Sequence, residues 1–150
     1  FKIMADCRLG RAEQALSTLH KMIPDSKDNP VSITGAEPYL FVNCWCMHPS
    51  FFTRIWFGWF TGTSAWALRG FYEGICGLRR EYGGLRVQPC IPGAWKELTL
   101  TRTFRGCRYH IHISNTGSGK PEVTVDGNRL ADTLLPVLND GQIHEVVVRT

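Results

Sequence analysis

A glycine between two threonines, Thr61-Gly62-Thr63, is the short motif whose residue types could do chemistry. Hydroxyl residues and a glycine at the start of a helix leave backbone N–H groups unpaired and add side-chain donors to them. These donors lie at the positive end of the helix dipole, so together they can bind an anion such as phosphate. An ordinary helix cap uses the same residue types, and composition alone leaves both interpretations open.

Four of the five tryptophans occur near this motif: Trp45, Trp56, Trp59 and Trp66. Tryptophans more often fill a core than stack on a ligand. A concentration of them beside a glycine-centred turn nevertheless suits sugar binding, because the apolar faces of sugar rings pack on aromatic side chains. Both interpretations stand at this point.

The histidines carry a weaker signal. His110 and His112 are two residues apart on a predicted strand, so both point to the same face and could share a metal ion. Since the sequence offers no obvious third metal ligand, we favour solvent-facing histidines and predict no metal site. His20, His48 and His144 are isolated in the sequence and support no catalytic group by themselves.

The first half of the chain, which must position the Thr61 motif, has apolar residues at helical spacing. One amphipathic helix is predicted from Ile3 to Ile23 and is ended by Pro24. The apolar residues 38–46 predict a short helix, with a strand as the alternative. A further helix follows Thr63 and extends to Arg79 and Arg80, which suit its C-terminal end. Such helices by themselves would leave much apolar surface exposed.

The second half alternates apolar and polar residues as strands do. Strands are predicted at 85–89, 98–104, 109–113, 123–125 and 144–148, with hairpin turns at Arg105-Gly106 and Asp126-Gly127. Short strands at this spacing predict a small antiparallel β-sandwich, and Gly83-Gly84 marks the boundary before it.

Composition excludes several classes of protein. The chain of 150 residues is 43% hydrophobic and 20% charged, which excludes a disordered chain. Its net charge of +4 is dispersed, so we expect no nucleic-acid partner, and no uncharged stretch reaches the length of a membrane-spanning helix. Six cysteines without a framework or metal-binding spacing indicate reduced thiols, and hence a cytoplasmic protein.

Several collinear runs of residues resemble the C-terminal part of the cellobiose and chitobiose phosphorylase family, glycoside hydrolase family 94. These runs are Glu37-Pro38-Tyr39, Trp59-Phe60-Thr61-Gly62-Thr63-Ser64-Ala65-Trp66, Glu73-Gly74-Ile75-Cys76-Gly77-Leu78, Tyr82-Gly83-Gly84-Leu85-Arg86-Val87-Gln88-Pro89-Cys90-Ile91-Pro92, Phe104-Arg105-Gly106, Tyr109-His110-Ile111 and Val123-Thr124-Val125-Asp126-Gly127. The likeness covers nearly the whole chain.

The resemblance implies an α+β fold, with the last helices of an (α/α)6 barrel at residues 1–82 and a small antiparallel β-sandwich at 83–150. It implies reversible, inverting phosphorolysis of a β-linked disaccharide or oligosaccharide such as cellobiose, which yields an α-sugar 1-phosphate. Inorganic phosphate is a substrate in this reaction, and no cofactor is expected. Members of the family are commonly dimers, so a homodimer is implied as well.

The resemblance also assigns site residues. The family's phosphate-holding Thr-Gly pair falls on Thr61 and Gly62, and we add Thr63 as the second hydroxyl of the turn. For the sugar we expect Glu37 and Asn43. Asn43 stands near the position of a glutamine that contacts the transferred sugar in many members, and this departure leaves the identity of the sugar open.

The family's general acid lies upstream of the segment that this chain matches, so no catalytic residue is assigned here. We therefore expect these residues alone to be inactive and to need the remainder of the same enzyme. The alternative is a non-catalytic carbohydrate-binding or structural module that uses the β-sandwich.

Overall fold

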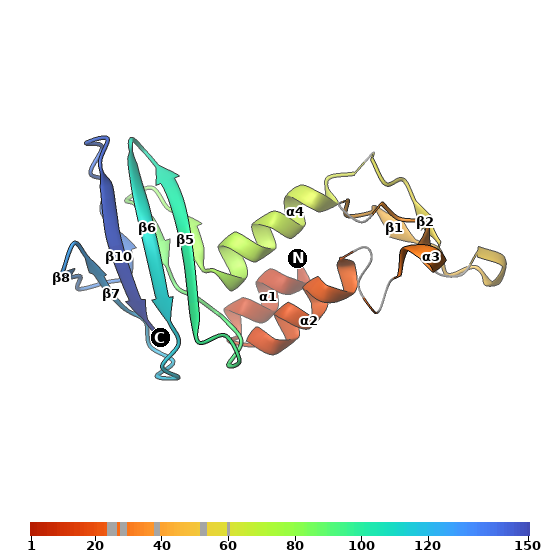
Figure 1. The fold of residues 1–150 in the computed structure, drawn as a ribbon, viewed down its shortest axis with the longest axis horizontal. Coiled ribbons are helices and arrows are strands. Elements are labelled where there is room, and N and C mark those ends of the chain that lie inside the picture. The colour runs from red at the N-terminus through yellow and green to blue at the C-terminus, as the bar shows by residue number, and fades with distance from the viewer. Residues whose placement is uncertain (24–26, 28–29, 38–39, 52–53, 60) are drawn as a thin grey trace. The chain divides into compact units, whose positions relative to one another are not determined.

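The computed structural model describes residues 1–23, 27, 30–37, 40–51, 54–59 and 61–150. Contacts between residues divide the chain into two compact units, Phe1–Phe71 and Tyr72–Thr150. Figure 1 shows helices in the first unit and the larger sheets in the second. Each unit is described by itself below. The expected boundary between barrel and sandwich at residues 82 and 83 stays a prediction, as does the barrel itself.

Two helices, α1 (Lys2–Arg8) and α2 (Ala12–Met22), open the helical unit, so the prediction of one helix from Ile3 to Ile23 was wrong. The break is at Gly10, whose φ of 69° lies in the left-handed region. The N–H of Arg11 donates to the carbonyl of Asp6, and that of Gly10 to Cys7. This is the hydrogen-bond pattern by which a glycine ends a helix.

The middle of the helical unit is mostly irregular. A short helix, α3 (Val31–Thr34), is followed by two paired antiparallel strands, β1 (Cys44–Trp45) and β2 (Ile55–Trp56), with a 3-10 turn, η1 (Pro49–Phe51), between them. The helix predicted over 38–46 was therefore wrong where the structure describes it, and Pro38 and Tyr39 lie outside the described residues. A strand was the alternative, and Trp45, which is partly buried in β1, belongs to a residue type that favours strands.

The helix predicted after Thr63 is shorter than expected. It consists of α4 (Thr63–Arg69) and a π-helical continuation, η2 (Gly70–Ile75). Arg79 and Arg80 do not end it, because both belong to strand β3 (Leu78–Arg80). The chain passes from helix to strand at Gly77, whose φ is 70°. A Cβ at this position would lie 1.9 Å from the carbonyl oxygen of Gln88. A helix cannot continue through a left-handed residue packed this closely.

The β unit contains two sheets (Figure 1). The smaller has the order β3, β4 (Leu85–Val87), β9 (Leu134–Leu135). The larger has the order β5 (Glu97–Phe104), β6 (Cys107–Ser114), β10 (Ile143–Arg149), β7 (Glu122–Val125), β8 (Asn128–Arg129). All five predicted strands and both hairpins are present.

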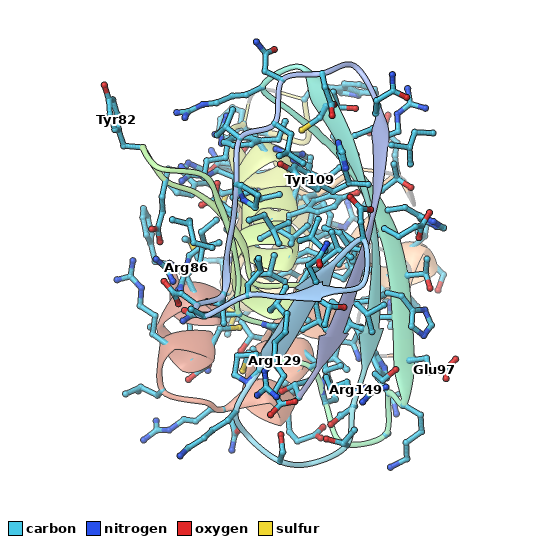
Figure 2. All side chains as sticks on the ribbon, turned by 90° about the vertical axis from the view of Figure 1, so that its left-hand side faces the viewer. Tyr82, Arg86, Glu97, Tyr109, Arg129 and Arg149 are labelled. Carbon is cyan, nitrogen blue, oxygen red and sulfur yellow. The ribbon has the colours of Figure 1, made fainter. Side chains whose placement is uncertain are left out.

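One strand pair departs from the antiparallel prediction. Strand β10 runs parallel to β6, with Val146 opposite Ile111, and antiparallel to β7. A parallel pair needs a long connection, and here residues 115–142 supply it. The core of the unit consists of the inward residues of both sheets, and the side chains gather between the ribbons (Figure 2). The largest fully buried ones include Tyr109, Leu85, Ile111, Ile113, Leu135, Val146 and Val148.

Across the described residues, no helix has the length and apolar character to cross a bilayer. All six cysteines are free thiols. Burial raises the pKa of the Cys76 thiol to about 12, so this side chain stays neutral and packs as a small apolar group.

Candidate functional site

The Thr61-Gly62-Thr63 motif forms the start of α4, as predicted. Gly62 is the N-cap residue, and its carbonyl accepts the first helical hydrogen bond from the N–H of Trp66, at 3.0 Å. The N–H of Thr63 donates to Oγ1 of Thr61 at 3.0 Å. The side chain of Thr61 therefore caps the helix from one residue further out than an ordinary N-cap does.

The two threonine hydroxyls form a pair. Their Oγ1 atoms are 2.7 Å apart, so one hydroxyl donates to the other. Whichever donates, the hydrogen of the remaining hydroxyl is left for a partner outside the pair. The N–H groups of Ser64 and Ala65 have no acceptor within the helix, because the first helical bond belongs to Trp66. The turn thus presents one hydroxyl and two backbone donors.

Nothing in the described part of the chain demands a glycine at position 62. Its φ is −84°, and a Cβ would lie 3.7 Å from Cδ1 of Trp66, which is an ordinary contact. The usual reasons for glycine, a positive φ or a close approach within the chain, are therefore missing here. Glycine is also a favoured N-cap residue, and its missing Cβ leaves the backbone here open to approach by a group from outside these residues.

Asn43 lies beside the segment that leads to this turn. Its backbone N–H donates to the carbonyl of Phe57 at 3.3 Å, which extends the pairing of β1 with β2. Phe57 has a φ of 56°, unusual for an aromatic residue, and turns the chain after β2. Figure 1 shows this strand pair and the start of α4 at the same end of the helical unit.

Glu37 contacts the same segment. Its Oε1 accepts a hydrogen bond from the indole Nε1 of Trp59 at 3.1 Å. A Cβ on Gly58 would lie 3.7 Å from Oε2 of Glu37 and 3.2 Å from Cδ2 of Leu40. The glycine therefore leaves room beside the carboxylate.

The structure thus brings Asn43 and Glu37 against residues 57–59, while Thr61, Gly62 and Thr63 follow directly in the chain. Sequence reasoning missed Trp59 as the partner of Glu37. The two residues are 22 positions apart in irregular segments, where no periodicity indicates a contact. Trp59 is 65% exposed, so most of its ring is available to a ligand or to another part of the protein.

His110 and His112 lie on the solvent side of β6, as favoured from the sequence. Nδ1 of His110 is 3.2 Å from Oε1 of Glu145, and Nδ1 of His112 is 3.0 Å from Oγ1 of Thr99. No three histidine, cysteine or carboxylate side chains in the described ranges are grouped so that they could hold a metal ion.

His144 is isolated in the sequence but not in the structure. Its Nδ1 lies 2.8 Å from Oδ2 of Asp126 and its Nε2 3.1 Å from Oδ1 of Asp140. The hydrogen bonds to Asp126 and Asp140 raise the pKa of His144, and the pKa values of both carboxyl groups are lowered. An imidazole with a carboxylate at each nitrogen is stabilised as its cation. This group joins the β7–β8 turn to the loop before β10.

Two family models match the chain in succession. Residues 1–77 match the catalytic domain of the glycosyl hydrolase 94 superfamily, and residues 78–130 match the C-terminal domain of glycosyl hydrolase family 65. The first match covers more than half of the chain. It includes Glu37, Asn43 and the threonine turn.

Curated relatives agree with this match. The chain is 37% identical to a solabiose phosphorylase of Paenibacillus borealis, over 99% of the chain and 20% of that protein. It is 32% identical to an N,N'-diacetylchitobiose phosphorylase of Vibrio furnissii, over 83% of the chain and 16% of that protein. It is also 32% identical to a cellobionic acid phosphorylase of Neurospora crassa, over 91% of the chain and 18% of that protein.

The chain spans about a fifth of the length of these relatives, all of which are phosphorylases by name. The family resemblance predicted from the motifs is thereby confirmed. The chain belongs to the glycosyl hydrolase 94 superfamily.

Proposed function

We propose that this chain is the C-terminal part of an inverting glycoside phosphorylase and that it supplies part of the phosphate site. The substrates would be inorganic phosphate and a β-linked glucosyl disaccharide or oligosaccharide of the cellobiose type. The product would be an α-sugar 1-phosphate. Because the first family match is to a catalytic domain, the enzyme interpretation is favoured over a stand-alone binding module.

The observation that carries the proposal is the threonine turn. Among the described residues, one hydroxyl hydrogen of the pair and the N–H groups of Ser64 and Ala65 have no acceptor, and Gly62 has neither a positive φ nor a close internal contact. Backbone and hydroxyl donors at one turn suit the oxygens of phosphate. Gly62 would then allow an oxygen to approach the backbone where a Cβ would interfere.

In the reaction, a phosphate oxygen bonds to the anomeric carbon while the glycosidic C–O bond breaks on the opposite face, so that the β-linkage becomes an α-phosphate. The leaving oxygen takes a proton from a carboxylic acid that this chain does not contain. A hydrolase needs a second carboxylate to activate water, but phosphate is already an anionic nucleophile. The threonine turn therefore stands in place of that second carboxylate.

Glu37 and Asn43 would contact the sugar. Trp59 occupies Oε1 of Glu37, which leaves Oε2, beside Gly58, to accept a sugar hydroxyl. The backbone N–H of Asn43 bonds to Phe57, and among the described residues its side-chain amide has no partner, so that amide could donate to and accept from a sugar. The relatives act on different disaccharides by name, and the side chain at position 43 is one feature that would select among them.

The test uses the full-length enzyme that contains this chain. It is incubated with phosphate and each of cellobiose, laminaribiose and chitobiose, and the products are followed by phosphorus and proton NMR. The proposal expects an α-sugar 1-phosphate from one of them. Release of free sugar without a phosphate ester, or a β-phosphate, would contradict it.

A further inference from the structure

A groove of about 580 Å³ opens in the β unit, between its two sheets. It lies at β3 and β5, which are edge strands of the smaller and the larger sheet. Arg80 belongs to β3, Arg102 to β5 and Arg105 to the turn that follows β5. The groove is open to solvent and is lined by three arginines that come from two sheets.

Two of these guanidinium groups are held in place without a counter-charge. Arg102 lies over the ring of Tyr72 at 5.9 Å, and Arg105 lies over Phe104 at 5.1 Å. Arg105 also donates to the backbone carbonyl of Tyr82 at 2.6 Å and to that of Glu81 at 3.5 Å. Neither Arg102 nor Arg105 forms an ion pair with any described residue.

Glu81 also lines the groove and Glu73 forms a long ion pair with Arg80, but neither carboxylate is paired with Arg102 or Arg105. Both oxygens of Glu81 accept hydrogen bonds from Arg86, at 2.5 Å and 3.0 Å, and this lowers the pKa of Glu81. Glu73 is 4.0 Å from Arg80, which is the outer limit for an ion pair. The groove therefore has a surplus of positive charge.

The conformation of the turn that carries Arg105 also favours a binding role for this arginine. Arg105 and Gly106 have φ values of 44° and 83°, and Phe104 pairs with Cys107, as in a two-residue hairpin turn with positive φ at both positions. Asn, Asp or Gly is preferred at the first of these positions, so arginine is there against the local preference. Its bonds to two carbonyls use two of its five N–H donors, and the others remain available.

We propose that this groove binds a phosphate dianion, either free or as the ester of a sugar. Planar guanidinium groups that are already fixed pair well with phosphate, and a dianion is attracted more strongly than a carboxylate monoanion by several positive charges. The groove is larger than phosphate alone, which leaves room for an attached sugar. The site lies in the β unit and does not depend on the threonine turn. Figure 2 shows Tyr82 at its rim, projecting away from the sheets.

The experiment is differential modification of arginines by phenylglyoxal on the full-length protein, with each adduct measured by peptide mass spectrometry. Inorganic phosphate and glucose 1-phosphate are the probes, and glucuronate is the monoanion comparator. At ten times the dissociation constant, an occupied site is modified about tenfold more slowly. We expect this protection at Arg102 and Arg105. Arg108, which is exposed on β6 outside the groove, is the control and stays unprotected.

Two variants complete the test. Thr61→Val removes a hydroxyl from the proposed catalytic phosphate site, and protection at Arg102 and Arg105 should persist in it. Arg102→Gln should weaken the protection of Arg105, whereas Arg108→Gln should not. Tighter protection by glucose 1-phosphate than by phosphate would show that the sugar is also bound, and equal protection would show recognition of the phosphate alone.

Three results would overturn the proposal. They are no protection by either probe, equal protection of Arg108, and equal protection by glucuronate at the same concentration. Loss of protection in Thr61→Val would also contradict it, because the effect would then come from the other site. Since protection is read at individual arginines, failure of phosphorolysis itself leaves this result interpretable.

Discussion

The two units differ in what they bury. In the β unit, Tyr109, Ile111, Ile113 and Val146 are fully buried, and the sheets enclose their own core. In the helical unit, large apolar side chains remain exposed: Trp56 by 52%, Phe57 by 59% and Trp59 by 65%. A soluble domain rarely leaves such a group of aromatic side chains uncovered unless a partner or ligand contacts them.

This difference matches the lengths of the relatives. They are about five times as long as the chain, and the helical unit matches a catalytic domain whose remaining parts could cover these aromatic side chains. The same unit carries the threonine turn, Glu37 and Asn43. The residues proposed to bind the substrates of phosphorolysis are therefore in the unit with the exposed aromatic side chains.

The largest effect should be on solubility. The 150-residue chain produced alone should associate or aggregate through its helical unit and bind a hydrophobic dye, because its exposed aromatic side chains lack a cover. A shorter chain that begins at Gly83 serves as the comparison, measured by analytical ultracentrifugation. A monomeric 150-residue chain that binds no dye would mean that its helices form a closed core.

A second contrast concerns stability. Ile111→Ala should lower the free energy of unfolding of the β unit by about 3 kcal/mol, because it leaves a cavity in a closed core. Trp56→Ala should change that free energy by less than about 0.5 kcal/mol, because its side chain is half exposed and lies in the other unit. Urea denaturation followed by circular dichroism measures both. Equal losses would contradict the description of two separate units.

The sugar specificity should respond to position 43. If Asn43 contacts the transferred sugar, Asn43→Gln in the full-length enzyme should shift the ratio of kcat/KM between two disaccharides by roughly tenfold, because a hydrogen bond is gained with one sugar and misplaced with the other. Asn128→Gln, on the exposed strand β8, is a matched control. An unchanged ratio would remove Asn43 from the sugar site.

The smallest expected effect is a pH dependence confined to the β unit. The pKa of His144 is raised, so its contribution to stability is fully present below its unfolded pKa of about 6.5 and is lost as the pH rises through the folded pKa. The pKa values of Asp126 and Asp140 are lowered, so their contributions are present above about pH 4 and are lost on further acidification. Stability from this group is therefore greatest between about pH 4 and 6.5.

Comparison of urea midpoints at pH 5.5 and 8.5 measures this effect. The wild-type midpoint should fall more between the two values than that of His144→Gln, which cannot titrate. An identical fall in both proteins would show that His144 does not contribute.

Local patterns predicted the β unit well and the helical unit less well, for physical reasons. Alternation identified β5, β6 and β10, because one face of β6 and of β10 is buried and one face of β5 is partly buried. The helix breaks at Gly10 and Gly77 were missed, because a glycine inside an apolar repeat does not reveal a positive φ. At Gly77 the cause is the carbonyl of Gln88, which directly follows β4, the partner strand of β3.

In the candidate site, too, local features were predictable from the sequence and contacts between distant residues were not. The turn at Thr61 was predictable, because capping residues act within a few positions of one another. The bond from Trp59 to Glu37 and the two carboxylates at His144 were not, since they join residues that are distant in sequence. Only the folded chain brings such pairs together.

The most direct test of the phosphate site is the apparent KM for phosphate of Thr61→Val in the full-length enzyme. Valine keeps the shape of threonine but removes the hydroxyl that pairs with Thr63 and caps its N–H. Thr101→Val, on the exposed face of β5, makes the same change away from the turn. We predict that the KM for phosphate rises about tenfold or more in Thr61→Val, with only a small fall in melting temperature from the lost cap and an unchanged KM for the disaccharide. A KM for phosphate equal to that of Thr101→Val would contradict the assignment.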